Sequence, residues 1–137
     1  MAVSLYKYGE LRLRLGGDVV RVFYRRPAAR ELIETLTRKM PRGDEAKDAE
    51  RILVANLDLG AACVTGIGEG DLEIDGAVLV TDEARAGYQS DWRQVVADRC
   101  PLVLIALGQY VSALPSFLEE AALKKTSGMP GESLAAG

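Results

Sequence analysis

The sequence predicts an α+β fold, with an N-terminal β-hairpin, a bundle of about four helices and one short extra strand. Two patterns indicate it. Residues 10–25 alternate apolar and polar side chains on both sides of a glycine pair, as a hairpin with one apolar face does. After Pro27, apolar residues recur mainly at helical spacing, and glycines and prolines separate the segments. We expect one domain over residues 1–125 and a flexible tail over residues 126–137, whose composition has no periodicity.

The hairpin is the most regular segment. Leu11, Leu13 and Leu15 lie on one face of its first strand, and arginines lie on the other face. We expect the two-residue turn at Gly17-Asp18, because glycine supplies the positive φ of a tight turn. This turn predicts the cross-strand pairs Leu15–Val20, Leu13–Val22 and Leu11–Tyr24.

Two helices are expected after the hairpin. The first begins at Pro27, whose missing N–H is not needed in a first helical turn, and it ends before Pro41. The second runs over residues 44–67 with Asp44 as its N-cap. The buried positions that their spacing predicts are Ala29, Leu32 or Ile33, Leu36 and Met40 in the first helix, and Ala49, Ile52, Leu53, Asn56, Leu57 and Ala61 in the second.

The second half of the chain alternates short elements. An Asp75-Gly76 turn leads into a short strand over Val78–Val80. A helix begins near Ser90 with Trp92 facing inward, and Pro101 ends it. A strongly apolar helix follows Pro101, and residues 116–125 form a last short helix.

The residue types argue against the common enzyme chemistries. The chain has no histidine, which is the usual general base near neutral pH and the commonest metal ligand. Its two cysteines, Cys63 and Cys100, lie far apart in apolar surroundings, which favours buried free thiols. We therefore expect no catalytic residue, no cofactor, no metal and no enzyme activity.

The stretch GIGEGDLEIDG, residues 66–76, resembles two kinds of ligand loop. A dinucleotide loop needs a strand before its glycines and a helix after them, whereas here a helix precedes them and carboxylates follow. In a calcium loop, Asp71, Glu73 and Asp75 would supply the first ligands, but the last position holds Asp82 in place of glutamate. We expect an acidic, solvated turn, and weak calcium binding stays open.

Six arginines gather around the hairpin: Arg12, Arg14, Arg21, Arg25, Arg26 and Arg30. With Phe23 as a stacking residue they could form a face for nucleic acid. The formal net charge of −3 and the neighbouring glutamates weigh against that partner, because a solvated strand face often carries charges. We expect no nucleic-acid partner.

The apolar helix after Pro101 is the remaining signal. It is too short to span a bilayer, which takes about 20 residues, and the first residues do not form a signal peptide. We expect a cytoplasmic protein without a membrane partner. The helix lies in the core, or it also forms a partner groove. The candidate partner-binding residues are Leu104, Leu107, Tyr110, Val111, Phe117 and Leu118.

These segments follow an order found in one protein family. In LRLRLGGDVVRVFYRRPAARELIETL, a hairpin leads through an Arg-Pro step into a helix. In DGAVLVTDEARAGYQSDWRQVVADRCPLVLIALGQYV, a turn and strand precede a helix with an early tryptophan and an apolar helix that begins at proline. Over roughly residues 10–123 the chain resembles the tail assembly chaperones of tailed phages.

The resemblance implies a non-enzymatic phage or prophage protein in the host cytoplasm. Such a protein binds the tape-measure protein during tail assembly, is absent from the virion and associates with itself. Many of these phages also make a longer product by frameshifting, for which Lys124-Lys125 would mark the place. An apolar groove would cover the apolar helix of the tape-measure protein. The alternative is a small regulatory or nucleic-acid-associated module that uses the arginine face.

Overall fold

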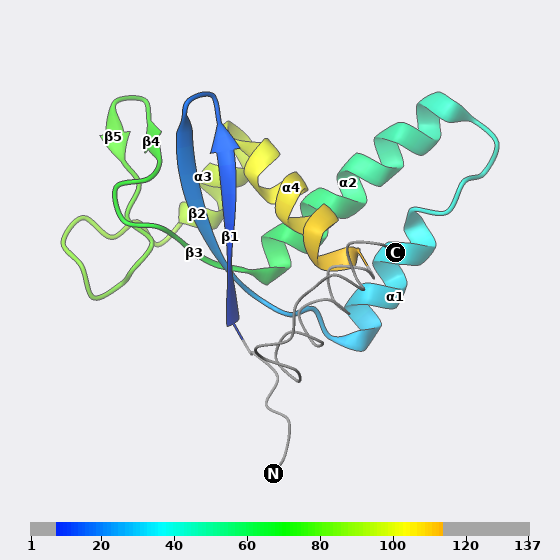
Figure 1. Ribbon diagram of the computed structural model, residues 1–137, viewed down its shortest axis with the longest axis horizontal. Helices are drawn as coiled ribbons and strands as arrows, with labels where there is room; N and C mark the ends of the chain where they lie inside the picture. Colours follow the sequence, from blue (N-terminus) through cyan, green and yellow to red (C-terminus); the bar gives the residue numbers. More distant parts are fainter. Residues whose placement is uncertain (1–7, 114–137) are drawn as a thin grey trace, which may run out of the picture.

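The computed structural model describes residues 8–113 and confirms the α+β class (Figure 1). An antiparallel sheet of three strands lies over a layer of helices. The elements are, in order, β1 (Tyr8–Leu15), β2 (Asp18–Arg25), α1 (Ala29–Arg38), α2 (Glu45–Cys63), β3 (Val64–Ile67), β4 (Glu73–Ile74), β5 (Ala77–Val78), α3 (Trp92–Arg99) and α4 (Pro101–Ser112). The predicted last helix and the predicted tail lie outside the described residues.

The β1–β2 hairpin forms as predicted, but its register differs from the prediction. The turn is at Gly16-Gly17, and Gly16 has a φ of 64°. Leu13 therefore faces Val20 and Leu11 faces Val22, a shift of two residues that keeps every side chain on its predicted face. The register also places Gly9 opposite Tyr24, whose ring lies so close that a Cβ at Gly9 would be 2.5 Å from its Cζ.

The third strand was not predicted. We expected residues 44–67 to be one helix, but α2 ends at Cys63 and β3 begins at Val64 with no loop between them. β3 pairs antiparallel with β2, and a bulge near Tyr24 shifts the register. The strand is short and follows a run of small residues, so its sequence has too few positions to show a period of two.

The second helix starts as predicted, whereas the first starts two residues after the predicted Pro27, and both bury partly different faces from those predicted. Asp44 Oδ1 accepts the Lys47 backbone N–H at 3.2 Å, which confirms this N-cap. The first helix begins at Ala29 because the Glu31 carboxylate accepts the Ala28 backbone N–H at 2.8 Å. The predicted stripes are partly wrong, since Met40 and Leu53 are exposed to 61% and 52%. Of the alternatives Leu32 and Ile33, Leu32 is half-buried and Ile33 is exposed to 63%. Asn56 is buried as predicted, and Leu57 and Ala61 pack against the core. The residues that α2 buries are Ala55, Asn56, Leu59, Gly60 and Cys63.

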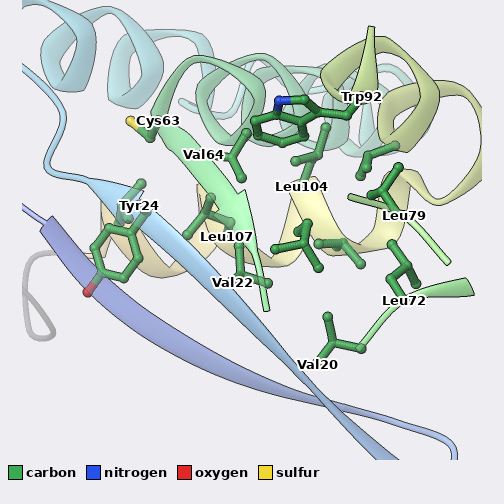
Figure 2. Close-up of a cluster of buried hydrophobic side chains, with 14 of the residues drawn as sticks. Val20, Val22, Tyr24, Cys63, Val64, Leu72, Leu79, Trp92, Leu104 and Leu107 are labelled. Atoms are coloured by element: carbon green, nitrogen blue, oxygen red, sulfur yellow. The ribbon is translucent and has the colours of Figure 1, made fainter. Parts of the chain in front are cut away.

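The helix α4 is the centre of the core (Figure 2). Leu104 and Leu107 are fully buried between the sheet and α2, next to Val22 and Val64. Glycines let α2 and α4 approach closely. A Cβ at Gly60 would lie 1.9 Å from the Leu104 carbonyl oxygen, and a Cβ at Gly108 would lie 1.9 Å from the Asn56 carbonyl oxygen. Backbone therefore packs on backbone where these helices cross.

The segment between β3 and α3 closes one end of the core. The Asp75-Gly76 turn is confirmed, with φ values of 52° and 82°, and it joins β4 to β5 where a single strand was expected over Val78–Val80. Trp92 begins α3 and is buried as predicted, beside Leu79 (Figure 2). Pro101 separates α3 from α4, also as predicted.

Candidate functional site

The described partner-binding candidates belong mainly to the core. Leu104 and Leu107 have no exposed surface, and Val111 is exposed to only 6%. Tyr110 is half-buried and packs edge to face on Tyr24, with ring centroids 5.9 Å apart. The apolar face of α4 is therefore covered by other segments of the same chain. Phe117 and Leu118 lie outside the described residues.

Among the described residues, four exposed large apolar side chains lie on or next to the helical hairpin of α1 and α2. Ile33 and Met40 are seven positions apart, and Leu53 and Val54 are exposed on α2 to 52% and 42%. The Arg51 guanidinium donates to the Met40 carbonyl at 2.7 Å, so Met40 lies beside the first half of α2. The amphipathic pattern did signal apolar positions on these helices, but it assigned them to the core. We call Ile33, Met40, Leu53 and Val54 the hairpin patch.

The acidic stretch 66–76 is fixed to the sheet by an ion pair. The Asp71 carboxylate accepts both the Arg21 guanidinium, at 2.8 and 3.1 Å, and the Arg21 backbone N–H at 2.8 Å. The Arg21 side chain lowers the pKa of Asp71, because these hydrogen bonds favour the ionised form. The stretch is thus built into the fold at Asp71, where we expected a solvated turn.

Two further carboxylates of this stretch are also paired. Asp75 accepts the Arg99 guanidinium at 2.6 Å, and Glu69 pairs with Arg85. Across residues 8–113, no three cysteine or carboxylate side chains lie together in a way that would hold a metal ion. Asp71 and Asp75 would have to leave their arginines before they could act as calcium ligands.

The arginines around the hairpin are partly neutralised. Arg12 donates to Glu10 at 2.9 Å, and Arg21 pairs with Asp71 as described. Arg25 makes two hydrogen bonds to Glu31, at 2.8 and 2.9 Å. These bonds and the Ala28 N–H lower the pKa of Glu31 to about 2. Arg12, Arg21 and Arg25 thus each have a carboxylate partner, which weakens the face that a nucleic acid would need.

A hollow of about 600 Å³ opens between the outer face of the sheet and the segment after β5. Gly66 forms part of its wall, and Phe23 and Val80 supply apolar surface. Thr81 connects the segment after β5 to β3, because its Oγ1 accepts the Ile67 N–H at 3.0 Å. Two basic and two acidic side chains line it: Arg21, Arg85, Glu69 and Asp82. The hollow therefore has no strong preference for one charge.

A polar network joins α2, α4 and the C-cap residue of α1. Lys39 Nζ donates to Asn56 Oδ1 at 3.0 Å and to Ser112 Oγ at 2.9 Å, and Asn56 and Ser112 are both buried. Ser112 in turn donates to the Gly108 carbonyl at 2.7 Å. Burial lowers the pKa of Lys39. Sequence periodicity marked only Asn56 of these residues, because hydrogen-bond partners distant in the chain leave no periodic signal.

The cysteines behave as the sequence suggests. Cys63 is buried and Cys100 half-buried, and both are free thiols. Burial raises the pKa of Cys63 to about 11, so its thiol stays protonated and unreactive near neutral pH.

Comparison with protein-family models, with curated proteins and with solved structures finds no significant match. Within residues 8–113, no single helix is long and apolar enough to cross a membrane. In the same described part of the chain, α3 and α4 together reach that length and composition, as a pair bent by 99°.

Proposed function

We propose that the chain is a non-enzymatic tail assembly chaperone of a phage or prophage, which binds the tape-measure protein in the host cytoplasm. The order of elements supports this proposal. A hairpin leads through Arg26-Pro27 into α1, and a turn, a tryptophan-led helix and a proline-started apolar helix follow. This is the order on which the resemblance to that family depends.

The observation that carries the proposal is the hairpin patch. Ile33 and Met40 are the most exposed of its large apolar side chains, at 63% and 61%. Exposed large apolar side chains on helices are typical of a surface that accepts an amphipathic helix. A tape-measure protein is long and helical, and its apolar face needs a cover before the tail tube forms around it. We assign the partner surface to α1 and α2 and no longer to the buried side of α4.

Co-expression with the tape-measure protein of the same genome tests the proposal. We expect the unmodified chain to raise the soluble yield of the partner and to co-purify with it. The triple variant I33Q/M40Q/L53Q should lose co-purification by about tenfold or more, since buried apolar side chains at an interface each contribute on the order of 1 kcal/mol. Glutamine keeps helix propensity, so the variant should fold.

The matched control is V19T/V78T/L102Q, which removes three apolar side chains exposed to 44%, 49% and 66% outside the hairpin patch. It should bind as the unmodified chain does. An insoluble, unbound tape-measure protein in the presence of the unmodified chain would contradict the function. Equal losses in both triple variants would contradict the assigned surface. Salt-dependent binding to DNA or RNA would favour the nucleic-acid alternative instead.

A further inference from the structure

The strand β1 forms an open edge of the sheet. The order of strands is β1-β2-β3, so within the described residues β1 has a neighbour on one side only. It is eight residues long, contains no proline and has an unbroken register with β2. Natural edge strands usually carry a proline, a bulge or a cover that prevents pairing with another chain. β1 has no proline and no bulge, and no strand among residues 8–113 pairs with its open edge.

The backbone of Arg21 shows which groups of β1 point outward. Its N–H donates to Asp71 and its carbonyl accepts the Gly68 N–H at 2.8 Å, so both point away from β1. Arg21 faces Arg12 in the register, which makes this a pair without mutual hydrogen bonds. The N–H and C=O of Arg12 therefore point to the open edge. By alternation, those of Glu10 and Arg14 do the same.

The inner face of β1 is only partly covered. Leu11, Leu13 and Leu15 pack against the core but stay half-buried, whereas Val20 and Val22 opposite them are exposed to 2% and 0%. Figure 1 shows β1 beside β2, which is the middle strand of the sheet. A further strand beside β1 would cover the flanks of these leucines and add apolar burial to backbone hydrogen bonds.

If two copies of β1 are paired antiparallel, the charged side chains on their outer faces are complementary. We propose that β1 pairs with β1 of a second copy about a two-fold axis at Arg12, which joins the two sheets into one. Glu10 then faces Arg14 of the second copy, and Leu11 faces Leu13. A slip in one direction would set Arg12 opposite Arg14, and a slip in the other would set Leu13 opposite Gly9. The two Arg12 side chains meet at the axis, where Glu10 already binds each at 2.9 Å.

Sedimentation velocity of the full chain, from about 5 to about 500 µM, tests this dimer, because interfaces of this small size dissociate in that range. We expect a monomer–dimer equilibrium. Glu10→Arg and Arg14→Glu should each raise the dissociation constant about tenfold or more, since each sets like charges opposite at two symmetric places. The double variant E10R/R14E should restore it. Glu34→Arg, the same charge change on exposed α1, is the control.

Arg12→Pro gives a second, independent test. Proline removes the outward N–H at the axis and is tolerated where an edge strand faces solvent. The variant should be monomeric with an unchanged circular dichroism spectrum. A chain that is monomeric throughout the range would overturn the proposal. So would a dimer whose dissociation constant is indifferent to the charge reversals, or a double variant that stays as weak as the single ones.

Discussion

The carboxylate of Glu31 connects the end of the sheet to the start of α1. It binds the Arg25 guanidinium at the end of β2 with two hydrogen bonds and accepts the Ala28 N–H at the helix N-terminus. A carboxylate in the first turn also interacts favourably with the helix dipole. The chain therefore passes from β2 to α1 over Arg26-Pro27, and the Glu31 side chain binds both sides of this turn. In the sequence, Pro27 indicated where α1 begins, but the position of the helix N-terminus depends on Glu31.

Glu31→Gln should make the free energy of unfolding change less with pH in the acidic range. The pKa of Glu31 is about 2 in the folded chain and 4.5 in its ordinary state. Its stabilising contribution is therefore complete above pH 4.5 and is lost as pH falls toward 2. We expect the variant to lose about 1 kcal/mol of unfolding free energy at pH 7, a value reduced by solvent exposure. The difference from the unmodified chain should shrink at pH 4 and again at pH 3 in urea titrations. Glu34→Gln, exposed on the same helix, is the control.

At the scale of elements, the main contact is the crossing of α2 and α4. Two glycines, Gly60 and Gly108, make it, and each faces a backbone carbonyl of the other helix. The second half of α2 contains several small residues, which permit a close helix contact. The sequence pattern could not identify the helix that packs against α2. A glycine indicates that another group approaches closely, but it does not indicate which one.

Gly60→Ala should be strongly destabilising. Its Cβ would lie 1.9 Å from the Leu104 carbonyl oxygen, and backbone on both sides leaves no flexible side chain to move. We expect a loss of about 2 to 4 kcal/mol in unfolding free energy by chemical denaturation. Gly17→Ala is the control, since nothing lies within 4 Å of a Cβ there. Equal stability of the two variants would contradict the close crossing of α2 and α4.

The ion pair of Arg21 and Asp71 should control the mobility of the segment after β3. Asp71→Asn weakens the hydrogen bonds to the Arg21 guanidinium and N–H. We expect amide hydrogen exchange at Gly68 and Asp71 to accelerate about tenfold or more, while Val20 in the hairpin keeps its protection. Glu73→Gln, exposed on β4, should leave all three amides unchanged. Uniform acceleration would indicate global destabilisation and contradict a local role.

At the scale of the whole molecule, the network of Lys39, Asn56 and Ser112 fixes α1 against α2 and α4. Its members are far apart in the chain, and its hydrogen bonds of 2.9 and 3.0 Å converge on one ammonium group. Each polar group is satisfied, and among residues 8–113 no buried side-chain nitrogen or oxygen lacks a hydrogen-bond partner. The network therefore orients α1, which carries part of the hairpin patch.

Lys39→Ala should destabilise the protein by about 1 to 3 kcal/mol, because it leaves the buried Asn56 carbonyl without this donor. Lys47→Ala, which removes an exposed lysine side chain on α2, should change stability little. Thermal unfolding of the two variants under the same conditions measures the difference. A Lys39 variant as stable as the Lys47 variant would contradict a structural role for the network.

Much of the fold could be predicted from local signals, and most of the site could not. The hairpin, the Asp44 cap, the Asp75-Gly76 turn and the break at Pro101 depend on residues close in sequence, and all are confirmed. The hairpin register and β3 were missed because they depend on contacts of Tyr24 and Val64 with distant residues. The assignment of candidate partner-binding residues to α4 depended on hydrophobicity alone. Hydrophobicity identified α4 as apolar, but only the packing shows that its apolar face is already used.

The crossing of α2 and α4 also determines when the fold can be completed. Gly60 meets Leu104, and β3 reaches β2 only after α1 and α2 have been inserted between them. Such distant contacts form late, because the loop entropy must be overcome before they contribute. The β1–β2 hairpin can close as soon as it is synthesised, whereas Leu59 and Cys63 stay uncovered until α4 has left the ribosome. During its own synthesis the protein therefore passes through a stage in which the later core face of α2 is still exposed.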